Sequence, residues 1–511
     1  MTQPWWQTGV LYQIYPRSFL DTDGNGIGDL EGVRRRIAYL RDLGVDGVWL
    51  SPIYRSPMAD FGYDVSDHCD IDPVFGDLAA FDRLLDEAHA GGLRVLLDWV
   101  PNHTSDRHPW FQESRSSPAS PKRDWYVWRD GRDDATPPNN WRAAFGGPAW
   151  TWDQTTEQWY LHLFLPEQPD LDWANPAVVE AMHGVLQFWL DRGVDGFRAD
   201  VVHLIGKDQE LPDQPPQLAD VHLAGVHDHP ATHPLLRGIR QVLDAYPGDR
   251  VMVGEVNLGS AALLAPYYGA DDELHMVFNF SLLHARWDAA RWAALVEESE
   301  AALKPADAWP VWVLSNHDTP RHRSRYGGSE PRARVAAAVL LTLRGTPFLY
   351  AGEELGLTDA EIPADAKVDP GGRDGCRAPV PWDRAANYGW ADDPWLPWPP
   401  EAGTRNATAQ EADSASILHL YRRLLAARRD SPALHGGEWR RLPAAPGVLA
   451  YERRSRDDVR RVVANFGDDL VVRVAATEGW AVEISTDGHG EGGPWDGRLR
   501  PESAVVLRPS G

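Results

Sequence analysis

The chain has 511 residues, of which 43% are hydrophobic and 24% charged, the balance of a soluble globular protein with roughly three domains. Its net charge of −25 argues against nucleic acid and anionic membrane as partners, because both would repel it. A small neutral ligand fits this charge better than an anionic one.

The two cysteines, Cys69 and Cys376, rule out a disulfide scaffold and leave room for one bridge at most. The first residues lack the basic region and apolar stretch of a signal peptide. The longest apolar run, 336–343, is too short to span a bilayer. We therefore expect a cytoplasmic protein. Nothing in the sequence indicates an oligomeric state.

Eight short apolar runs alternate with segments of helical period up to about residue 430. The candidate strands are 11–15, 45–50, 94–98, 194–198, 250–255, 276–280, 311–315 and 346–351. The candidate helices include 29–43, 78–91, 177–192, 233–246, 284–302 and 331–344. Strands that are apolar throughout are typical of parallel strands covered on both faces. The pattern therefore predicts a (β/α)8 TIM barrel, a fold of the α/β class.

Three further segments complete the predicted architecture. Residues 104–173 are rich in Trp, Pro, Asn and Asp, lack helical period, and predict an irregular subdomain inserted after the third strand. A second irregular stretch spans about 355–403, and a helix over 412–429 would close the barrel. From residue 436 onward, the strand patterns 448–454, 459–466, 470–476 and 503–509 predict a small antiparallel β domain. The predicted domains are a barrel of 1–103 and 174–435, the inserted subdomain 104–173, and a C-terminal domain 436–511.

Polar residues follow the apolar runs where each strand ends in a loop, and barrels of this type hold their active sites there. They are Asp98, Asn102 and His103 after the third strand, Arg198 and Asp200 on the fourth, Glu255 after the fifth, and Asn316, His317 and Asp318 after the seventh. Such a cluster is costly to maintain unless its members are paired or serve chemistry. The sequence therefore predicts an active site on this rim.

Asp200 and Glu255 end adjacent strands, which lie about 4.8 Å apart in a sheet. A retaining glycosidase needs two carboxyl groups about 5–5.5 Å apart, one to attack the anomeric carbon and one to protonate the leaving oxygen. Arg198 lies on the same side of its strand as Asp200 and would hold that carboxylate ionised. Glu255 would carry the proton, and Asp318 and His317 could grip sugar hydroxyls.

Seven segments carry a resemblance to a known family: QIYPRSF (13–19), SPMADFGYD (56–64), DWVPNHT (98–104), QPDLDW (168–173), DGFRAD (195–200), GEV (254–256) and SNHD (315–318). In this order they resemble glycoside hydrolase family 13, the α-amylase family, in its α-glucosidase and oligo-1,6-glucosidase branch. The resemblance covers the barrel from end to end. It implies an exo-acting retaining α-glucosidase that releases glucose from short α-linked oligosaccharides.

The resemblance also implies roles for individual residues. Asp200 would be the nucleophile, Glu255 the general acid/base and Asp318 the stabiliser of the transition state. The sugar-binding residues carried over are Tyr63, Asp64, His103, Arg198 and His317, with Phe145 and Phe164 as aromatic walls. Arg377 is carried over from segment 373–377 (RDGCR), which departs from the branch's DNAR motif at two positions.

Linkage preference is less defined. The QPDL segment favours an exo-acting enzyme over an endo-acting amylase. Val201 follows the nucleophile, and in related enzymes valine there goes with tolerance of α-1,6 bonds. His203 either contacts the leaving group or is a structural histidine. An oligo-1,6-glucosidase, or a glycosyl-transferring isomerase such as trehalose synthase or sucrose isomerase, would carry the same catalytic residues. A non-catalytic protein is disfavoured because all three carboxylates are present.

The segment 21–29 (DTDGNGIGD) predicts a cation site. Its ligands would be the side-chain oxygens of Asp21, Asp23, Asn25 and Asp29 and the carbonyl of Ile27, a set that suits a hard cation such as Ca²⁺. The loop is not an EF-hand, because its twelfth position is Gly32 rather than Glu. Relatives bind a structural Ca²⁺ or Mg²⁺ with this loop, so we expect a structural ion and no organic cofactor.

Overall fold

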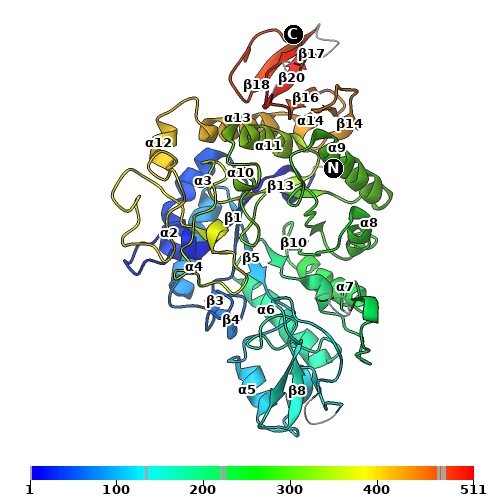
Figure 1. Cartoon of the computed structure of the whole chain (residues 1–511). Helices are drawn as coiled ribbons and strands as arrows, with labels where there is room; N and C mark the ends of the chain where they lie inside the picture. Colours follow the sequence, from blue (N-terminus) through cyan, green and yellow to red (C-terminus); the bar gives the residue numbers. More distant parts are fainter. Residues whose placement is uncertain are drawn as a thin grey trace.

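The structure is a computed structural model of the chain. It describes residues 3–132, 136–218, 223, 226–468, 472–473 and 479–510. Three regions follow one another in space: a C-terminal β domain at one end, a barrel in the middle, and a subdomain that carries α5 and β8 at the far end (Figure 1).

The barrel is a sheet of eight parallel strands in the order β11-β10-β9-β5-β2-β1-β13-β12. Their bounds are β1 Leu11–Ile14, β2 Gly47–Leu50, β5 Arg94–Trp99, β9 Gly196–Ala199, β10 Val251–Gly254, β11 Met276–Val277, β12 Val311–Val313 and β13 Thr346–Tyr350. A parallel bridge between Asn279 and Trp312 joins the two edge strands and closes the barrel. The predicted fold and its eight strands are confirmed.

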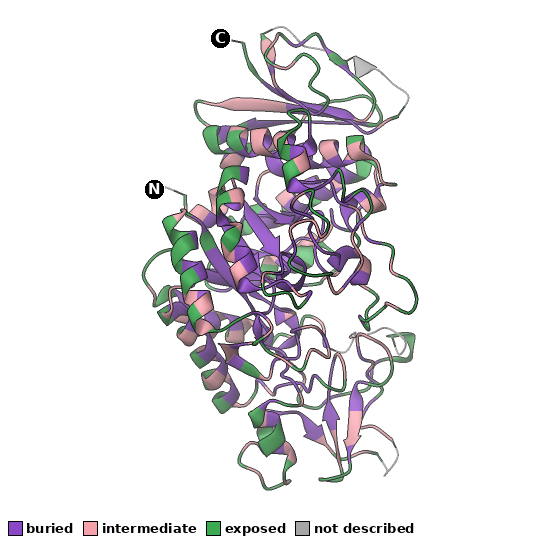
Figure 2. Cartoon of the chain, turned by 90° about the vertical axis from the view of Figure 1, so that its left-hand side faces the viewer, coloured by how far each residue is buried: buried purple, intermediate pink, exposed green. Residues whose placement is uncertain are grey.

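The barrel interior is filled by side chains, as the apolar strands require. Leu11, Trp49, Leu96, Val253 and Phe348 belong to one buried cluster. The barrel strands are buried apart from Arg94 at the start of β5, whereas the surrounding helices alternate buried and exposed positions (Figure 2). This is the pattern of a core covered by amphipathic helices.

The predicted helix 29–43 is two helices, because the backbone leaves the helical conformation at Arg36; the other helices differ from their predicted ranges mainly at their ends. The helices around the barrel are α2 Leu30–Arg35, α3 Ile37–Leu43, α4 Leu78–Ala90, α6 Pro176–Asp191, α7 Thr232–Asp244, α8 Ala261–Leu264, α9 Ala289–Leu303, α10 His322–Arg325, α11 Glu330–Thr342, α12 Ala407–Glu411, α13 Ile417–Asp430 and α14 Pro432–His435. The predicted helix 284–302 begins later because Asp288 caps α9, and 412–429 begins at Ile417 because Ser416 caps α13. No helix of the described residues is long and apolar enough to cross a membrane.

The inserted segment 104–173 is more regular than predicted. It contains α5 (Pro109–Arg115) and a sheet of β6 (Trp128–Arg129), β8 (Gln158–Leu161) and β7 (Trp150–Asp153). Pro109 opens α5 at its first position, where proline is favoured, and short tryptophan-rich strands form the antiparallel sheet. The sequence pattern did not reveal these elements, because the helix is shorter than two turns and each strand has fewer than five residues.

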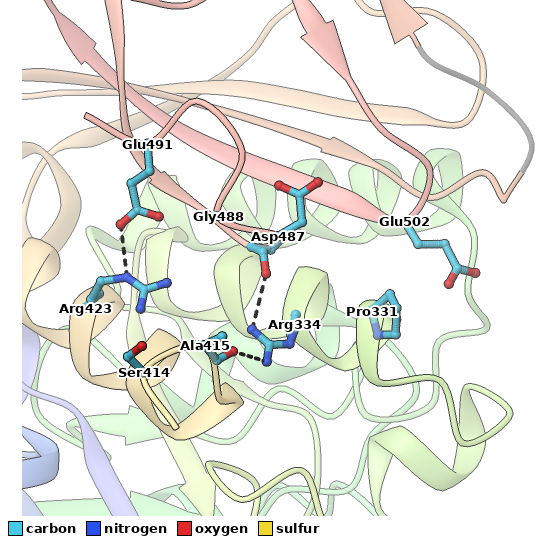
Figure 3. Close-up of a pocket in the computed structure, with 10 residues that line it drawn as sticks. Pro331, Arg334, Ser414, Ala415, Arg423, Asp487, Gly488, Glu491 and Glu502 are labelled. Atoms are coloured by element: carbon cyan, nitrogen blue, oxygen red, sulfur yellow. Dashed lines mark hydrogen bonds and ion pairs between the residues drawn. The ribbon is translucent and has the colours of Figure 1, made fainter. Parts of the chain in front are cut away.

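The C-terminal domain is an antiparallel sheet in the order β14-β15-β16-β20-β18. Its strands are β14 Glu438–Arg441, β15 Val448–Arg454, β16 Val459–Asn465, β18 Trp480–Ser485 and β20 Ser503–Pro509. The predicted strand 470–476 lies largely outside the described residues, apart from Val472–Arg473, which pairs as β17 with β19 (Arg498–Leu499). The sheet packs on α9 and α11, and a cavity of about 660 Å³ lies between the C-terminal domain and the helices α11 and α13 (Figure 3).

Candidate active site

Asp200 and Glu255 are placed by the register of two neighbouring strands. β9 and β10 pair in parallel, and their last paired residues are Ala199 and Gly254. Asp200 and Glu255 directly follow these two residues, and the Glu255 N–H donates to the Ala199 carbonyl oxygen at 2.8 Å. The two side chains therefore leave the barrel side by side, at the spacing of adjacent strands.

Arg198 binds three carboxyl groups at once. Its Nη1 donates to Asp98 Oδ1 and to Asp200 Oδ1, both at 2.8 Å. Its Nη2 donates to Glu255 Oε2. The guanidinium side chain is only 3% exposed. Because both members of the predicted catalytic pair bind the same guanidinium, their carboxyl groups face one small space, as a double displacement requires.

The cluster contains three acidic groups, Asp98, Asp200 and Glu255, and one basic group, Arg198. Burial raises the pKa of Asp98 to about 6 and also raises the pKa of Asp200, against the opposing effect of Arg198. Burial and the carboxylates of Glu255 and Asp98 raise the pKa of Asp200, and Arg198 acts against them, in the direction that the sequence predicts. The three carboxyl groups share one cation, so their titrations are linked.

Val201 turns the chain sharply after Asp200. Its φ of 36° and ψ of 38° lie in the left-handed region, which is rare for a β-branched residue. The turn directs the Val201 N–H to Glu255 Oε2 at 3.2 Å. Strain of this kind persists where the surroundings over-determine it, and here it helps to fix the Glu255 carboxyl group.

Asp318 sits opposite this pair and is an anion. Burial acts to raise its pKa, but His317 and two arginines together lower it below the usual value. Arg373 Nη1 and Arg377 Nη2 donate to Asp318 Oδ1 at 3.0 and 3.1 Å. Such a carboxylate can stabilise the positive charge that develops on a sugar ring.

These groups surround a cavity of about 260 Å³. Its walls combine carboxyl, imidazole, amide and apolar side chains, the mixture that sugar-sized ligands require. The lining residues are Asp60, Tyr63, His103, Ala144, Phe145, Phe164, Gln168, Asp200, Val201, His203, Leu204, Leu223, His227, Glu255, Asn257, Asp318 and Arg373.

The structure corrects the placement of Asp64. Its carboxylate is fully buried and accepts hydrogen bonds from Ser56 Oγ and from the N–H groups of Ala59 and Asp60. It therefore holds the turn together and does not line the cavity. Asp60, four residues earlier in the same motif, lines the cavity instead and pairs with Arg373 at 2.6 Å.

Arg377 is corrected in the same way. It is fully buried behind Asp318, where its Nε donates to the His317 carbonyl at 2.8 Å. Arg373, on the same short turn (374–377 and its cap), reaches the cavity wall. Arg198 and His317 also lie beneath the wall, so they act through Asp200 and Asp318 rather than by lining the cavity.

The remaining predicted wall residues line the cavity together. His103 packs against Phe164 with ring centroids 5.0 Å apart, and Phe164 contacts Phe145 at 6.2 Å. The Gln168 amide, from the QPDL segment, lies 3.0 Å from His103 Nε2 and donates to Asp60 Oδ2 at 3.2 Å. Tyr63 donates to Asp98 Oδ2 at 3.1 Å. The inserted segment thus supplies one wall of the cavity.

The predicted cation loop gathers its carboxylates at one point. Ligand oxygens of Asp21, Asp23 and Asp29 lie within 4.8 Å of one another. Asp21 and Asp29 are buried, and none of the three forms an ion pair within the described residues. Burial, followed by the nearby carboxylates of Asp29 and Asp21, raises the pKa of Asp23. Asp21 and Asp29 accept hydrogen bonds from backbone N–H groups, but no cation among the described residues offsets the three carboxylates, and such an oxygen cluster fits a hard cation.

Asp60, Gln168, Arg373, His227, Leu223 and Asn257 were not among the predicted site residues. Asp60 and Gln168 lie inside the segments 56–64 and 168–173 that carry the family resemblance, so those segments could have identified both as site residues. Arg373 lies four residues before Arg377 in segment 373–377, so the same segment could have identified it. His227 and Leu223 come from the connection between β9 and α7, whose sequence shows no period or motif.

A buried carboxyl pair at neighbouring strand ends of a (β/α)8 barrel, facing a third carboxylate across a sugar-sized cavity, is the arrangement of a glycoside hydrolase. Residues 13–437 match the family model described as alpha amylase, catalytic domain. The chain therefore belongs to the α-amylase family, glycoside hydrolase family 13.

Relatives cover nearly the whole chain. A probable alpha-glucosidase from Rhizobium meliloti is 42% identical over 92% of this chain and 90% of its own length. An oligo-1,6-glucosidase from Parageobacillus thermoglucosidasius is 37% identical over 92% of each chain. Among solved structures, an alpha-glucosyl transfer enzyme is 41% identical with a TM-score of 0.92, and the trehalulose synthase from Pseudomonas mesoacidophila is 33% identical with a TM-score of 0.94. Both structures are covered completely, as is this chain.

Proposed function

We propose that this chain is a retaining α-glucosidase that releases glucose from short α-linked oligosaccharides. The observation that carries the proposal is the carboxyl pair on adjacent strands, bound by one guanidinium at the wall of a small cavity. The alpha-glucosidase and oligo-1,6-glucosidase relatives support the same reaction class.

The reaction assigns one role to each carboxyl group. Asp200 attacks the anomeric carbon of a bound glucose and forms a glycosyl-enzyme, while Glu255, as general acid, donates a proton to the leaving oxygen. Glu255 then removes a proton from water, which displaces Asp200 and releases glucose. Asp318, an anion in the unliganded site, stabilises the ring as its positive charge develops.

The size of the cavity supports short substrates. A volume of about 260 Å³ lies just below the ~300–1,000 Å³ typical of ligand pockets, which suits a disaccharide better than a long chain. Gln168, Phe145 and Phe164 wall one side from the inserted segment. This wall favours an exo-acting enzyme.

A second candidate is a sugar isomerase, because the trehalulose synthase superposes on the whole chain. The two reactions share the glycosyl-enzyme and differ in whether water or the departing sugar attacks it. A panel of maltose, isomaltose, trehalose, sucrose and maltotriose, followed by product chromatography, separates them. Free glucose as the main product supports hydrolysis, an isomeric disaccharide supports isomerisation, and no turnover of any sugar contradicts both.

We also propose that the loop 21–29 holds a structural cation such as Ca²⁺ or Mg²⁺, with Asp21, Asp23 and Asp29 as carboxylate ligands and Asn25 and Ile27 supplying further oxygens. The ion would offset carboxylates that lack ion-pair partners among the described residues. We propose a cytoplasmic location as well, on the ground that Cys69 and Cys376 are both free thiols. Cell fractionation tests that location.

A further inference from the structure

The loop that carries Asp318 is closed at its base by a hydrogen-bonded pair. Ser315 follows β12 and His322 begins α10, so the two residues flank the segment 316–321. The His322 N–H donates to Ser315 Oγ at 2.9 Å, and the same Oγ lies 3.0 Å from His322 Nδ1. Both residues are buried. We call this pair the clasp, because it joins the two ends of the loop from which Asp318 faces the cavity.

The clasp bears directly on the orientation of Asp318. Asp318 lies three residues after Ser315, and its N–H donates to the side-chain oxygen of Asn316 at 3.0 Å. The loop has no regular secondary structure, so the hydrogen bonds at its two ends help to define where the carboxylate points. A group that stabilises a developing charge needs such supports, because small displacements cost activity.

Glu353 lies against the clasp from the turn that follows β13. Its Oε1 is 3.8 Å from His322 Nδ1, the same nitrogen that lies beside Ser315 Oγ. The Glu353 side chain is only 1% exposed. The turn and the loop are fixed to each other by Arg321, whose Nη1 donates to the Ala351 carbonyl oxygen at 2.8 Å. A buried carboxyl group is therefore held next to the hydrogen bond that closes the loop.

The surroundings of Glu353 keep its carboxyl group protonated at neutral pH. Burial raises its pKa to about 8, although the neighbouring backbone, the Ser315 hydroxyl and Arg321 act in the opposite direction. Burial also lowers the pKa of His322 to about 3, so both groups of the 3.8 Å contact are uncharged. The titratable or charged groups that face Glu353 are Arg321 and His322 at the start of α10, Tyr326 directly after it, Tyr421 on α13, and Glu354 on the same turn.

Ionisation of Glu353 sets a buried anion beside the clasp. The contact between Ser315 Oγ and His322 Nδ1 uses one hydrogen, and a carboxylate can only accept hydrogen bonds. Whichever of the two atoms holds that hydrogen, an anion attracts it more strongly than a neutral carboxyl group does. The new charge also favours protonation of His322, which lies within ion-pair distance. Both effects draw a member of the clasp toward Glu353 and away from its partner.

We propose that the clasp positions Asp318 for catalysis and that the neutral Glu353 carboxyl group keeps the clasp closed, so that ionisation of Glu353 opens it and lowers turnover. Ser315, His322 and Glu353 are positioning residues, because none of the three is among the residues that line the cavity. The inference rests on the proposed glucosidase function and adds to it a control of the transition-state stabiliser by pH.

The first test follows the pH dependence of kcat/KM for α-glucosyl fluoride, at a temperature well below the melting of each enzyme. Fluoride needs no proton in order to leave, so Glu255 as general acid does not shape the alkaline limb. We expect kcat/KM of the wild type to fall about tenfold as pH rises through about 8, the effect of one lost hydrogen bond. Glu353→Gln should remove this fall, because its amide stays neutral. An alkaline limb that is the same in both enzymes would overturn the proposal.

The matched control is Glu354→Gln. Glu354 is the neighbouring carboxyl group on the same turn and is also buried, but it accepts hydrogen bonds from the hydroxyl groups of Tyr12 and Tyr39 at 2.9 and 2.8 Å. This variant should keep the alkaline limb of the wild type. A limb that Glu354→Gln removes as fully as Glu353→Gln would assign the effect to the buried turn as a whole and contradict the clasp.

The second test asks whether the clasp acts through Asp318. His322→Ala should lower kcat/KM for the fluoride about tenfold in the wild-type background but less than about twofold in Asp318→Asn, where no carboxylate is left to position. Ser315→Ala removes the other half of the clasp with a smaller change in volume and should give the same result. Equal losses in both backgrounds would show that the pair does not act through Asp318.

A conservative variant separates positioning from folding. His322→Asn places a polar atom near the Nδ1 position, where it can still bond to Ser315 Oγ, and should keep most of the wild-type kcat/KM. An Asn variant as impaired as His322→Ala would contradict the role of that hydrogen bond. A wild type that turns over no sugar would contradict the glucosidase function and this inference together, whereas an active wild type whose alkaline limb survives in Glu353→Gln contradicts the clasp alone.

Discussion

Two cavities of the molecule differ in kind. The cavity between the barrel and the C-terminal domain is larger, about 660 Å³, and each of its charged lining residues has an ion-pair partner. The cavity at the strand ends is smaller, about 260 Å³, yet there one guanidinium serves three carboxyl groups and two imidazole nitrogens have no partner within the described residues. Incomplete pairing, rather than size, marks the site that can do chemistry.

The interdomain cavity illustrates the structural alternative. Arg334 reaches across it to the Thr486 carbonyl and also binds the Ala415 carbonyl, and Arg423 pairs with Glu491 (Figure 3). The Arg334–Thr486 hydrogen bond and the Arg423–Glu491 ion pair link the barrel to the C-terminal domain. The predictions below test this contrast, from the largest expected effect to the smallest.

Asp200→Asn should abolish hydrolysis, with a loss of about four orders of magnitude or more in kcat, because the attacking carboxylate is gone. The fold should persist, since removing one acid relieves a crowded cluster. Initial rates and thermal melts measure both effects. The control is Asp487→Asn in the interdomain cavity, which should leave turnover unchanged. Normal turnover by Asp200→Asn would refute its assignment as the nucleophile.

Chelation should lower the melting temperature by several degrees, because an ion bound only to the folded chain stabilises it by mass action. Adding Ca²⁺ back should restore the melting temperature, and Asp21→Asn should abolish the response. Differential scanning fluorimetry with and without EDTA measures the shift. Asp77→Ala, which removes the N-cap of α4, should lower stability but keep the response to chelator. An unchanged melt in EDTA would contradict the cation site.

Glu353→Gln should flatten the pH dependence of stability. Burial raises the pKa of the Glu353 carboxyl to about 8 from its ordinary 4.5. The folded chain then binds the extra proton between these values, so stability is fullest below about pH 4.5 and falls as pH rises through 8. The variant stays neutral, so its melting temperature should exceed that of the wild type by a few degrees near pH 8. Glu502→Gln, at the interdomain cavity, should not flatten the profile.

Arg334→Ala should have the smallest effect, a loss of about 1–2 kcal/mol, because it removes one hydrogen bond between the domains and one within the barrel but no catalytic group. Activity should be retained. Thermal melts and kinetics on the same sample measure both. Arg291→Ala removes an exposed ion pair on α9 and should cost less. A large loss of activity in Arg334→Ala would break the proposed division between the two cavities.

Much of the architecture was predictable from the sequence. The eight strands were visible because buried parallel strands are apolar without interruption, and Asp200, Glu255 and Asp318 were found because polar residues directly follow such runs. Strand register then places the first two side by side. These positions depend on regular structure, whose geometry the sequence pattern specifies.

The errors fall where the backbone is irregular. Asp60 and Asp64 share one turn, and no period tells which carboxylate faces the cavity and which caps the turn. Arg373 and Arg377 share one 3-10 turn with the same ambiguity. His227 enters from a connection without repeat or motif, so only the folded chain brings it beside His203.

The register of β9 and β10 has a consequence for how this enzyme can change over time. The distance between attacking group and proton donor is built into the most rigid part of the molecule, whereas the walls that select a sugar come from connections. Substitutions, insertions or deletions in those connections can retune which bond and which partner sugar are accepted while the bond-breaking step stays intact. New specificities are therefore reachable by small steps, without passing through an inactive intermediate.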